Sequence, residues 1–237
     1  MEQQNLKKRI NILTAYVVIS TSICLFLAFS AFRTSERKEK FDELEVKRIN
    51  VVGEKGDIRM VISNETRQHN GVLDGIAAEP RKREAGIIFF NTVGDECGGL
   101  VFNGDEKDAG LVLSVDQFRN DQVMQLQYME NTENKDRKYG LQLWEYPKEV
   151  RYKELLPKFN QLKGKSKEEQ KQMLASMRAD SLLSEDRLFL GRDFNKNVGL
   201  FIKDDTGRPR IKIYIDAQNR AKVEFLNEKG ELVKELL

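Results

Sequence analysis

An uncharged run of apolar residues dominates the N-terminal part of the chain. Residues 10–32 read INILTAYVVISTSICLFLAFSAF, with basic residues at 7–9 before them and Arg33 after them. As a helix, a run of this length rises about 34 Å, enough to cross a hydrocarbon core about 30 Å thick. We therefore predict a short tail over residues 1–9 and a single transmembrane helix over 10–32, which contacts the lipid bilayer.

The same segment could be a cleaved secretory signal. Ala28 and Ser30 have the spacing of a small-residue cleavage site. The run is longer than the roughly 7–15 apolar residues of a typical signal, and it remains bulky up to Phe32, which favours an uncleaved anchor. Basic residues lie on both sides of the run, and long C-terminal domains cross the membrane largely regardless of flanking charge. We expect the tail in the cytoplasm and the C-terminal domain on the exported side, periplasmic or extracellular.

Residues 33–45 (RTSERKEKFDELE) are charged and rich in helix formers, with Phe41 and Leu44 as their apolar side chains. We predict that they continue the membrane helix as a charged juxtamembrane helix. No heptad pattern is sustained, so a coiled-coil stalk is the less favoured interpretation.

From Val46 onwards apolar residues recur at every second position, as at Ile58, Met60 and Ile62. The turn signals are spaced as in a mainly β fold, an antiparallel hairpin meander that forms a sandwich, a curled sheet or an open barrel. We place its first part at 46–146 and its C-terminal hairpins at 186–237. Further strands are predicted at 99–103, 110–115, 122–129, 139–145, 187–191, 198–203, 210–215 and 221–226.

One turn pattern recurs along this β-rich part. Two apolar residues precede four turn residues that end in glycine, and an acidic residue follows, at 51–57, 89–95 and 225–231. The pattern is typical of a hairpin with a type I turn and a G1 bulge, whose last position takes a positive φ. We therefore expect positive φ at the glycines of these turns, which are Gly56, Gly94 and Gly230.

Two segments interrupt the meander. Residues 64–85 form a long polar loop, which holds the basic cluster 81–83. Residues 147–185 form a helical insertion that we expect to cover an open end or edge of the sheet. Ser166-Lys167-Glu168-Glu169 predicts a capping box. The residues predicted to face the sheet behind it are Met173, Leu174 and Met177, and a shorter helix near 149–156 is expected to be separated from this one by Pro157 and Gly164.

Composition limits the classes of partner. The chain has 40 basic and 38 acidic residues, a formal charge of +2, so no net field favours nucleic acid. Of the two cysteines, Cys24 lies in the apolar run and Cys97 is alone in the remainder. The β-rich domain therefore cannot form an intramolecular disulfide.

The sequence assigns no catalytic, cofactor-binding or metal-binding residue. Gly164-Lys165-Ser166 resembles the end of a phosphate-binding loop, but Phe159 stands where that motif needs glycine. His69 is the single histidine; without a histidine or cysteine neighbour it predicts a solvated side chain rather than a zinc ligand. Asp95 and Glu96 beside Cys97 should raise the pKa of the thiol, opposite to what a nucleophile needs.

Acidic residues gather between positions 95 and 121, at Asp95, Glu96, Asp105, Glu106, Asp108, Asp116 and Asp121. A pair of them could flank a glycosidic bond or bind a cation. Residues 103–108 lack the spacing of an EF-hand, and turn formation by itself explains Asp and Asn there. The basic residues of the 147–185 insertion could contact anionic headgroups, although a solvated helical face is the more common meaning.

The segments 49–52, 56–64 (GDIRMVISN), 94–102 (GDECGGLVF) and 116–126 resemble a family of uncharacterised bacterial proteins with a membrane segment and a β-rich domain. The resemblance implies a bacterial envelope protein and brings no assigned activity. Our first hypothesis is a membrane-anchored, non-enzymatic β-domain that binds a partner protein or an envelope polymer. The alternative is an envelope hydrolase that uses paired carboxylates from 95–121.

Overall fold

The computed structural model describes residues 2–31 and 39–236, which fall into two compact units, Met1–Glu45 and Val46–Leu237. The first unit contains the helix α1 (Glu2–Ala31). Its segment Glu2–Ser30 has a mean hydropathy of 2.3 over its most apolar window, and none of that window is buried. The chain thus has one N-terminal apolar helix with the length and composition of either a membrane span or a signal sequence.

The charged segment after this helix differs from our prediction. Residues 39–45 are irregular rather than helical, and residues 32–38 lie outside the described part of the chain. Isolated helices shorter than about 12–15 residues are marginal in water. The side chains of Phe41 and Leu44 are 62% and 54% exposed, so no tertiary contact compensates.

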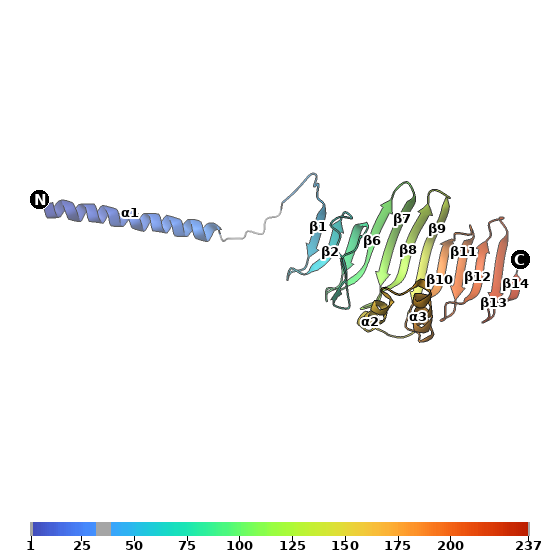
Figure 1. Cartoon of the computed structure of the whole chain (residues 1–237). Helices are drawn as coiled ribbons and strands as arrows, with labels where there is room; N and C mark the ends of the chain where they lie inside the picture. Colours follow the sequence, from blue (N-terminus) through green and yellow to red (C-terminus); the bar gives the residue numbers. More distant parts are fainter. Residues whose placement is uncertain (1, 32–38, 237) are drawn as a thin grey trace. The chain divides into compact units, whose positions relative to one another are not determined.

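The second unit is a single 12-stranded antiparallel sheet with strands in chain order, apart from a separate two-stranded hairpin between β2 and β5 (Figure 1). This confirms the antiparallel meander and resolves it as one open sheet. The hairpin consists of β3 (Val72–Leu73) and β4 (Ile76–Ala77). The sheet strands are β1 (Arg48–Val52), β2 (Ile58–Ser63), β5 (Ala85–Phe90), β6 (Glu96–Gly104), β7 (Asp108–Asp116), β8 (Gln122–Asn131), β9 (Asp136–Glu145), β10 (Glu185–Arg192), β11 (Val198–Lys203), β12 (Pro209–Ile215), β13 (Ala221–Leu226) and β14 (Leu232–Leu236).

The recurrent turns have the predicted geometry. Gly56, Gly94 and Gly230 have φ values of +81°, +90° and +77°. In the turn before Gly94, the Asn91 Oδ1 atom accepts hydrogen bonds from the backbone N–H groups of Val93 (3.0 Å) and Asp95 (3.1 Å). An Asx side chain at the first turn position thus satisfies backbone donors within the turn. The conformation of such a hairpin depends mainly on its own residues.

Hydrogen-bonded partners in neighbouring strands project their side chains from the same side of a sheet, and the register therefore defines two faces. One face carries the small buried core, in which Val61, Ile88 and Phe90 form a cluster. We call this the polar face, because polar side chains and glycines occupy most of its remaining positions. We call the opposite side the apolar face.

The helical insertion consists of α2 (Tyr152–Leu162) and α3 (Lys167–Ala179), at one end of the strands (Figure 1). The predicted capping box is present: Glu169 N–H donates to Ser166 Oγ at 3.3 Å, and Ser166 N–H donates to the Glu169 carboxylate at 2.9 Å. Met177 is buried (3% exposed), whereas Leu174 is 37% exposed; its predicted inward orientation is wrong.

The first helix of the insertion is longer than predicted. Pro157 lies inside α2 rather than at its end, although proline removes one backbone hydrogen bond from a helix. Leu155, one turn into the helix, is 2% exposed. Burial of this side chain favours a continuous helix, which overrides the local preference for a break.

Candidate functional site

The connection between β2 and β5 folds back over the polar face. The Gln68 Nε2 group donates to the backbone oxygens of Gly86 (3.2 Å) and Glu84 (3.3 Å). The His69 ring packs edge-on against Phe90, with ring centroids 4.7 Å apart. His69 is therefore half-buried rather than solvated as predicted, and burial, followed by the charge of Arg48, lowers its pKa.

The tip of this connection is attached to the helical insertion through Asp74. Its side chain is 1% exposed and accepts hydrogen bonds from Arg151 Nε (3.1 Å) and from Lys153 N–H (3.2 Å). Burial acts to raise the pKa of Asp74, but the bonds from Arg151 and Lys153 outweigh it and lower the pKa. Next to it, Gly75 N–H donates to the buried Asp95 carboxylate at 2.6 Å.

An ion pair lies beneath the same connection. Arg83 donates from two nitrogens to the two oxygens of Glu96, each at 2.8 Å, and the side chains are 12% and 16% exposed. The hydrogen bond to Glu96 raises the pKa of Arg83. Because both Glu96 oxygens accept from Arg83, this carboxylate is positioned as a structural anion rather than as a free base.

Asp116, the last residue of β7, has a different environment. Its Oδ1 atom is buried and has no hydrogen-bond partner among the described residues. Burial, together with the negative charges of Glu96 and Asp121, raises its pKa to about 7. The carboxyl group is therefore largely protonated at slightly acidic pH and can donate a hydrogen bond.

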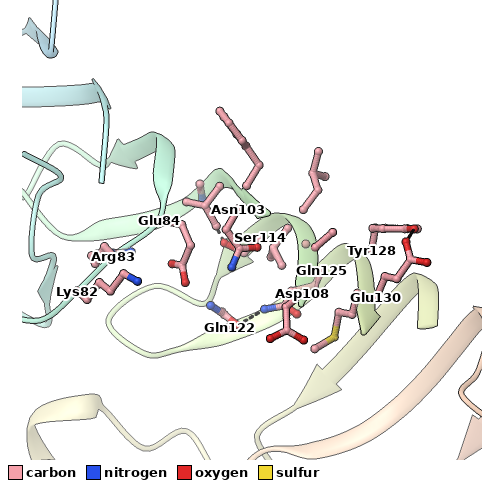
Figure 2. Close-up of a pocket in the computed structure, with 18 of the residues that line it drawn as sticks. Lys82, Arg83, Glu84, Asn103, Asp108, Ser114, Gln122, Gln125, Tyr128 and Glu130 are labelled. Carbon is pink, nitrogen blue, oxygen red and sulfur yellow. Dashed lines mark hydrogen bonds between the residues drawn. The ribbon is translucent and has the colours of Figure 1, made fainter. Parts of the chain in front are cut away.

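Arg83, Glu96 and Asp116 line a cleft with two adjoining parts, of about 700 Å³ and about 550 Å³. The first part includes Ser114, Gln122 and Gln125 of the polar face. Figure 2 shows Lys82 and Arg83 on one side of these side chains and Tyr128 and Glu130 on the other. The second part lies between the β3–β4 hairpin and α2, and includes Asp116. The residues common to both parts are Arg81, Arg83, Glu96 and Gln122.

Aromatic side chains line the second part of the cleft. Tyr152 and Phe159, one behind the other on α2, have their rings stacked with centroids 6.4 Å apart and an interplanar angle of 29°. In the first part, Gly99 contributes no side chain to the lining. The cleft thus combines amides, a carboxyl group of raised pKa, an ion pair and aromatic rings.

The remaining candidate residues, Cys97 and Asp105, lie in surroundings that account for them without a catalytic role. Burial, followed by the charges of Asp116 and Glu96, raises the pKa of Cys97, which confirms the predicted direction. Asp105 accepts hydrogen bonds from the N–H groups of Lys107 (2.7 Å) and Asp108 (3.0 Å) within its turn. Among residues 2–31 and 39–236, no three His, Cys, Asp or Glu side chains are grouped to hold a metal ion.

The polar side chains of the cleft were not predicted from the sequence. Gln122, Gln125 and Ser114 stand at ordinary polar positions of alternating strands, and they converge because β7 pairs with β8 in the observed register. The one local sign was the basic cluster 81–83. The chain matches no model of a known protein family and no curated protein, so the site is described from its geometry.

The pKa of Asp116 predicts a specific pH dependence. The pKa is raised in the folded state, so the folded state retains a proton that the unfolded state loses between about pH 4 and 7. Asp116 should make stability fall with rising pH across this window, by at most about 1.4 kcal/mol per pH unit.

Urea unfolding of the full chain in detergent, followed by the fluorescence of Trp144, measures this dependence. Asp116→Asn should remove that part of the slope and gain stability relative to the unsubstituted chain at pH 8. Asp205→Asn, at an exposed turn position, is the control and should leave the slope unchanged. Parallel pH profiles for the Asp116 variant and the unsubstituted chain would contradict the prediction.

Proposed function

We propose that this protein is a membrane-anchored, non-enzymatic β-domain that binds a glycan polymer of the cell envelope in the cleft of its polar face. The observation that carries the proposal is the two-part cleft, whose parts share the Arg83–Glu96 pair in their linings. A chain-like ligand fits such a shape better than a compact one does.

The lining has the chemistry that sugar recognition requires. Amides offer both donors and acceptors to hydroxyl groups, and Gln122 and Gln125 are hydrogen-bonded to each other along the floor (Figure 2). Tyr152 and Phe159 supply apolar surface for the faces of sugar rings. These features favour a glycan over a partner protein, because protein interfaces are usually more apolar at their centre.

The N-terminal helix supports the envelope location. Its apolar segment is long enough to span a bilayer and none of it is buried. An exported C-terminal domain on this anchor would stay close to the cell-wall polymers.

Binding can be tested with the full-length protein in lipid nanodiscs and soluble glycan strands released from bacterial cell wall. We expect saturable binding that weakens about fivefold in Gln125→Leu, because one hydrogen bond is worth about 1 kcal/mol. Gln172→Leu, on the exposed side of α3, should bind like the unsubstituted protein. Absence of saturable binding would refute the proposal, and equal affinity in both variants would place the ligand outside the cleft.

A hydrolase is the second candidate, because Asp116 has the raised pKa of a general acid and lies near two further carboxylates. The structure favours binding because Glu96 is engaged by Arg83 through both oxygens. Release of reducing ends from the same glycan strands, lost in Asp116→Asn, would favour the hydrolase instead.

A further inference from the structure

The apolar face carries an unbroken row of aliphatic side chains across all 12 strands of the sheet. Each residue of the row is the register partner of the row's residue in the neighbouring strand. The row consists of Ile49, Ile62, Ile87, Leu100, Leu113, Leu126, Leu141, Leu190, Leu200, Ile213, Val223 and Leu236.

The neighbouring row on the same face repeats the pattern. It is apolar or glycine at every strand except β14, where Lys234 pairs with Phe225. It consists of Val51, Met60, Phe89, Gly98, Val115, Met124, Leu143, Leu188, Ile202, Ile211, Phe225 and Lys234.

The polar face has no comparable row. The adjacent line of partners there consists of Asn50, Val61, Ile88, Gly99, Ser114, Gln125, Gln142, Phe189, Phe201, Lys212, Glu224 and Glu235. The sequence thus distinguishes the two faces along the whole sheet, as it does when one face is covered and the other is solvated.

Nothing in the described part of residues 46–236 covers the apolar face. None of the 12 aliphatic side chains of the first row is buried, and Leu126, Leu190 and Ile213 are 51%, 50% and 46% exposed. The β2–β5 connection packs on the opposite side, where it contacts Phe90 and Glu96. Domains are normally two packed layers, and the described residues 46–236 place no second layer on the apolar face.

We propose that the apolar face is covered by the same face of a second copy of this chain, so that the complete fold is a two-layered sandwich of two identical sheets. The area fits this occupant. Strands about 4.8 Å apart make the 12-stranded face roughly 53 Å wide. Side chains of one face are about 6.8 Å apart along a strand, so two rows are about 14 Å deep and cover roughly 740 Å². This area is close to the roughly 800 Å² per partner of a standard stable interface and exceeds the largest patch of a typical monomer.

The composition of the face also favours a second copy over other occupants. Attraction between basic side chains and anionic lipids strengthens the binding of an apolar surface to a bilayer, and the two rows contribute a single positive charge, that of Lys234. The helix α1 has no charge from Ile10 to Ala31, so a helix lying on the sheet would expose apolar residues to water. Two identical faces match in length and in polarity, and membrane anchors would hold them at a high effective concentration.

The consequence for the molecule is geometric. Face-to-face packing buries the apolar face and leaves the polar face of each copy outward, so an assembly of two presents two clefts. The inference does not depend on which ligand the cleft binds.

A photo-crosslinking amino acid in the full-length protein tests the contact without adding a charge. With benzoylphenylalanine at Leu190, on the apolar face, irradiation of the protein in nanodiscs should give a covalent dimer joined through apolar-face residues of the second chain. The same substitution at Lys212, on the polar face, should give none. Adducts of the Leu190 variant with lipid or with α1, or no adduct, would overturn the proposal.

Sedimentation equilibrium in density-matched detergent provides the second measurement. We expect a protein mass of two chains for the unsubstituted protein and for Gln125→Lys, and of one chain for Leu126→Lys, whose position neighbours Gln125 but belongs to the apolar face. A mass of one chain for the unsubstituted protein, or of two for Leu126→Lys, would refute the proposal. If Leu126→Lys does not fold, the crosslinking result decides.

Discussion

Alanine at Gly140 is expected to destabilise the sheet by about 3 kcal/mol or more, because it combines backbone strain with a steric clash. Gly140 and Gly191 are directly paired between β9 and β10 and have φ values of +145° and +156°. A Cβ atom on Gly140 would lie 2.1 Å from the Leu190 backbone oxygen and 2.7 Å from the Gly191 Cα atom. Both contacts are backbone, so only separation of the strands relieves them.

Urea unfolding of the full chain in detergent measures this loss through Trp144, which lies in β9. Gly104→Ala is the matched control, because Gly104 is also a strand glycine and a Cβ atom added there would have the Ala109 Cβ atom, 3.9 Å away, as its nearest contact. The control should change stability by less than about 1 kcal/mol. Equal losses for the two variants would show that the close approach of β9 and β10 is not what requires glycine.

Removal of the Asp74 carboxylate is expected to cost about 3 kcal/mol, since hydrogen bonds to a buried charge are among the stronger single interactions. Asp74→Asn is the informative change: asparagine tolerates the φ of +52° at this position, but it lacks the charge that Arg151 pairs with. The partial exposure of Arg151, 37%, keeps the cost below that of a fully buried pair.

The prediction has a pH signature. The folded state lowers the pKa of Asp74, so its stabilisation is complete above the unfolded pKa near 4 and is lost as the pH falls through the folded value. The stability difference between Asp74→Asn and the unsubstituted chain should therefore be largest near neutrality and shrink in acid. Asp57→Asn, in the half-exposed pair with Arg59, should cost less than about 1 kcal/mol. A loss that does not vary with pH would contradict the charge-based explanation.

Features that depend on neighbouring residues could be predicted from the sequence. Strands at 198–203 and 221–226 coincide with β11 and β13, because period-two alternation is a local property. The glycine turns at Gly56, Gly94 and Gly230 and the capping box at Ser166 were equally readable, since each is closed by hydrogen bonds between residues at most four apart. The apolar N-terminal helix follows from composition by itself.

Features that join distant parts of the chain required the tertiary structure. Asp74 contacts Arg151 across 77 positions, and no local pattern marks either residue. Pro157 lies inside a helix because the burial of Leu155 outweighs the local preference. Gly140 must be glycine because its φ is positive and because the backbone of Leu190 and Gly191 in β10 lies against it. In each case the interaction that stabilises the observed structure involves residues far away in the sequence. The strand register or the folding of the insertion brings those residues into contact.

The two faces of the sheet illustrate which features the sequence determines and which the tertiary structure determines. Alternation along each strand determined that every strand has an apolar and a polar side, and this is a property of the sequence. The register determined that the apolar sides join into one row from Ile49 to Leu236 and that Ser114 and Gln125 meet in a cleft on the other side. A shift of one residue in the pairing of two strands would interrupt the apolar row and the cleft, because successive side chains of a strand point to opposite faces.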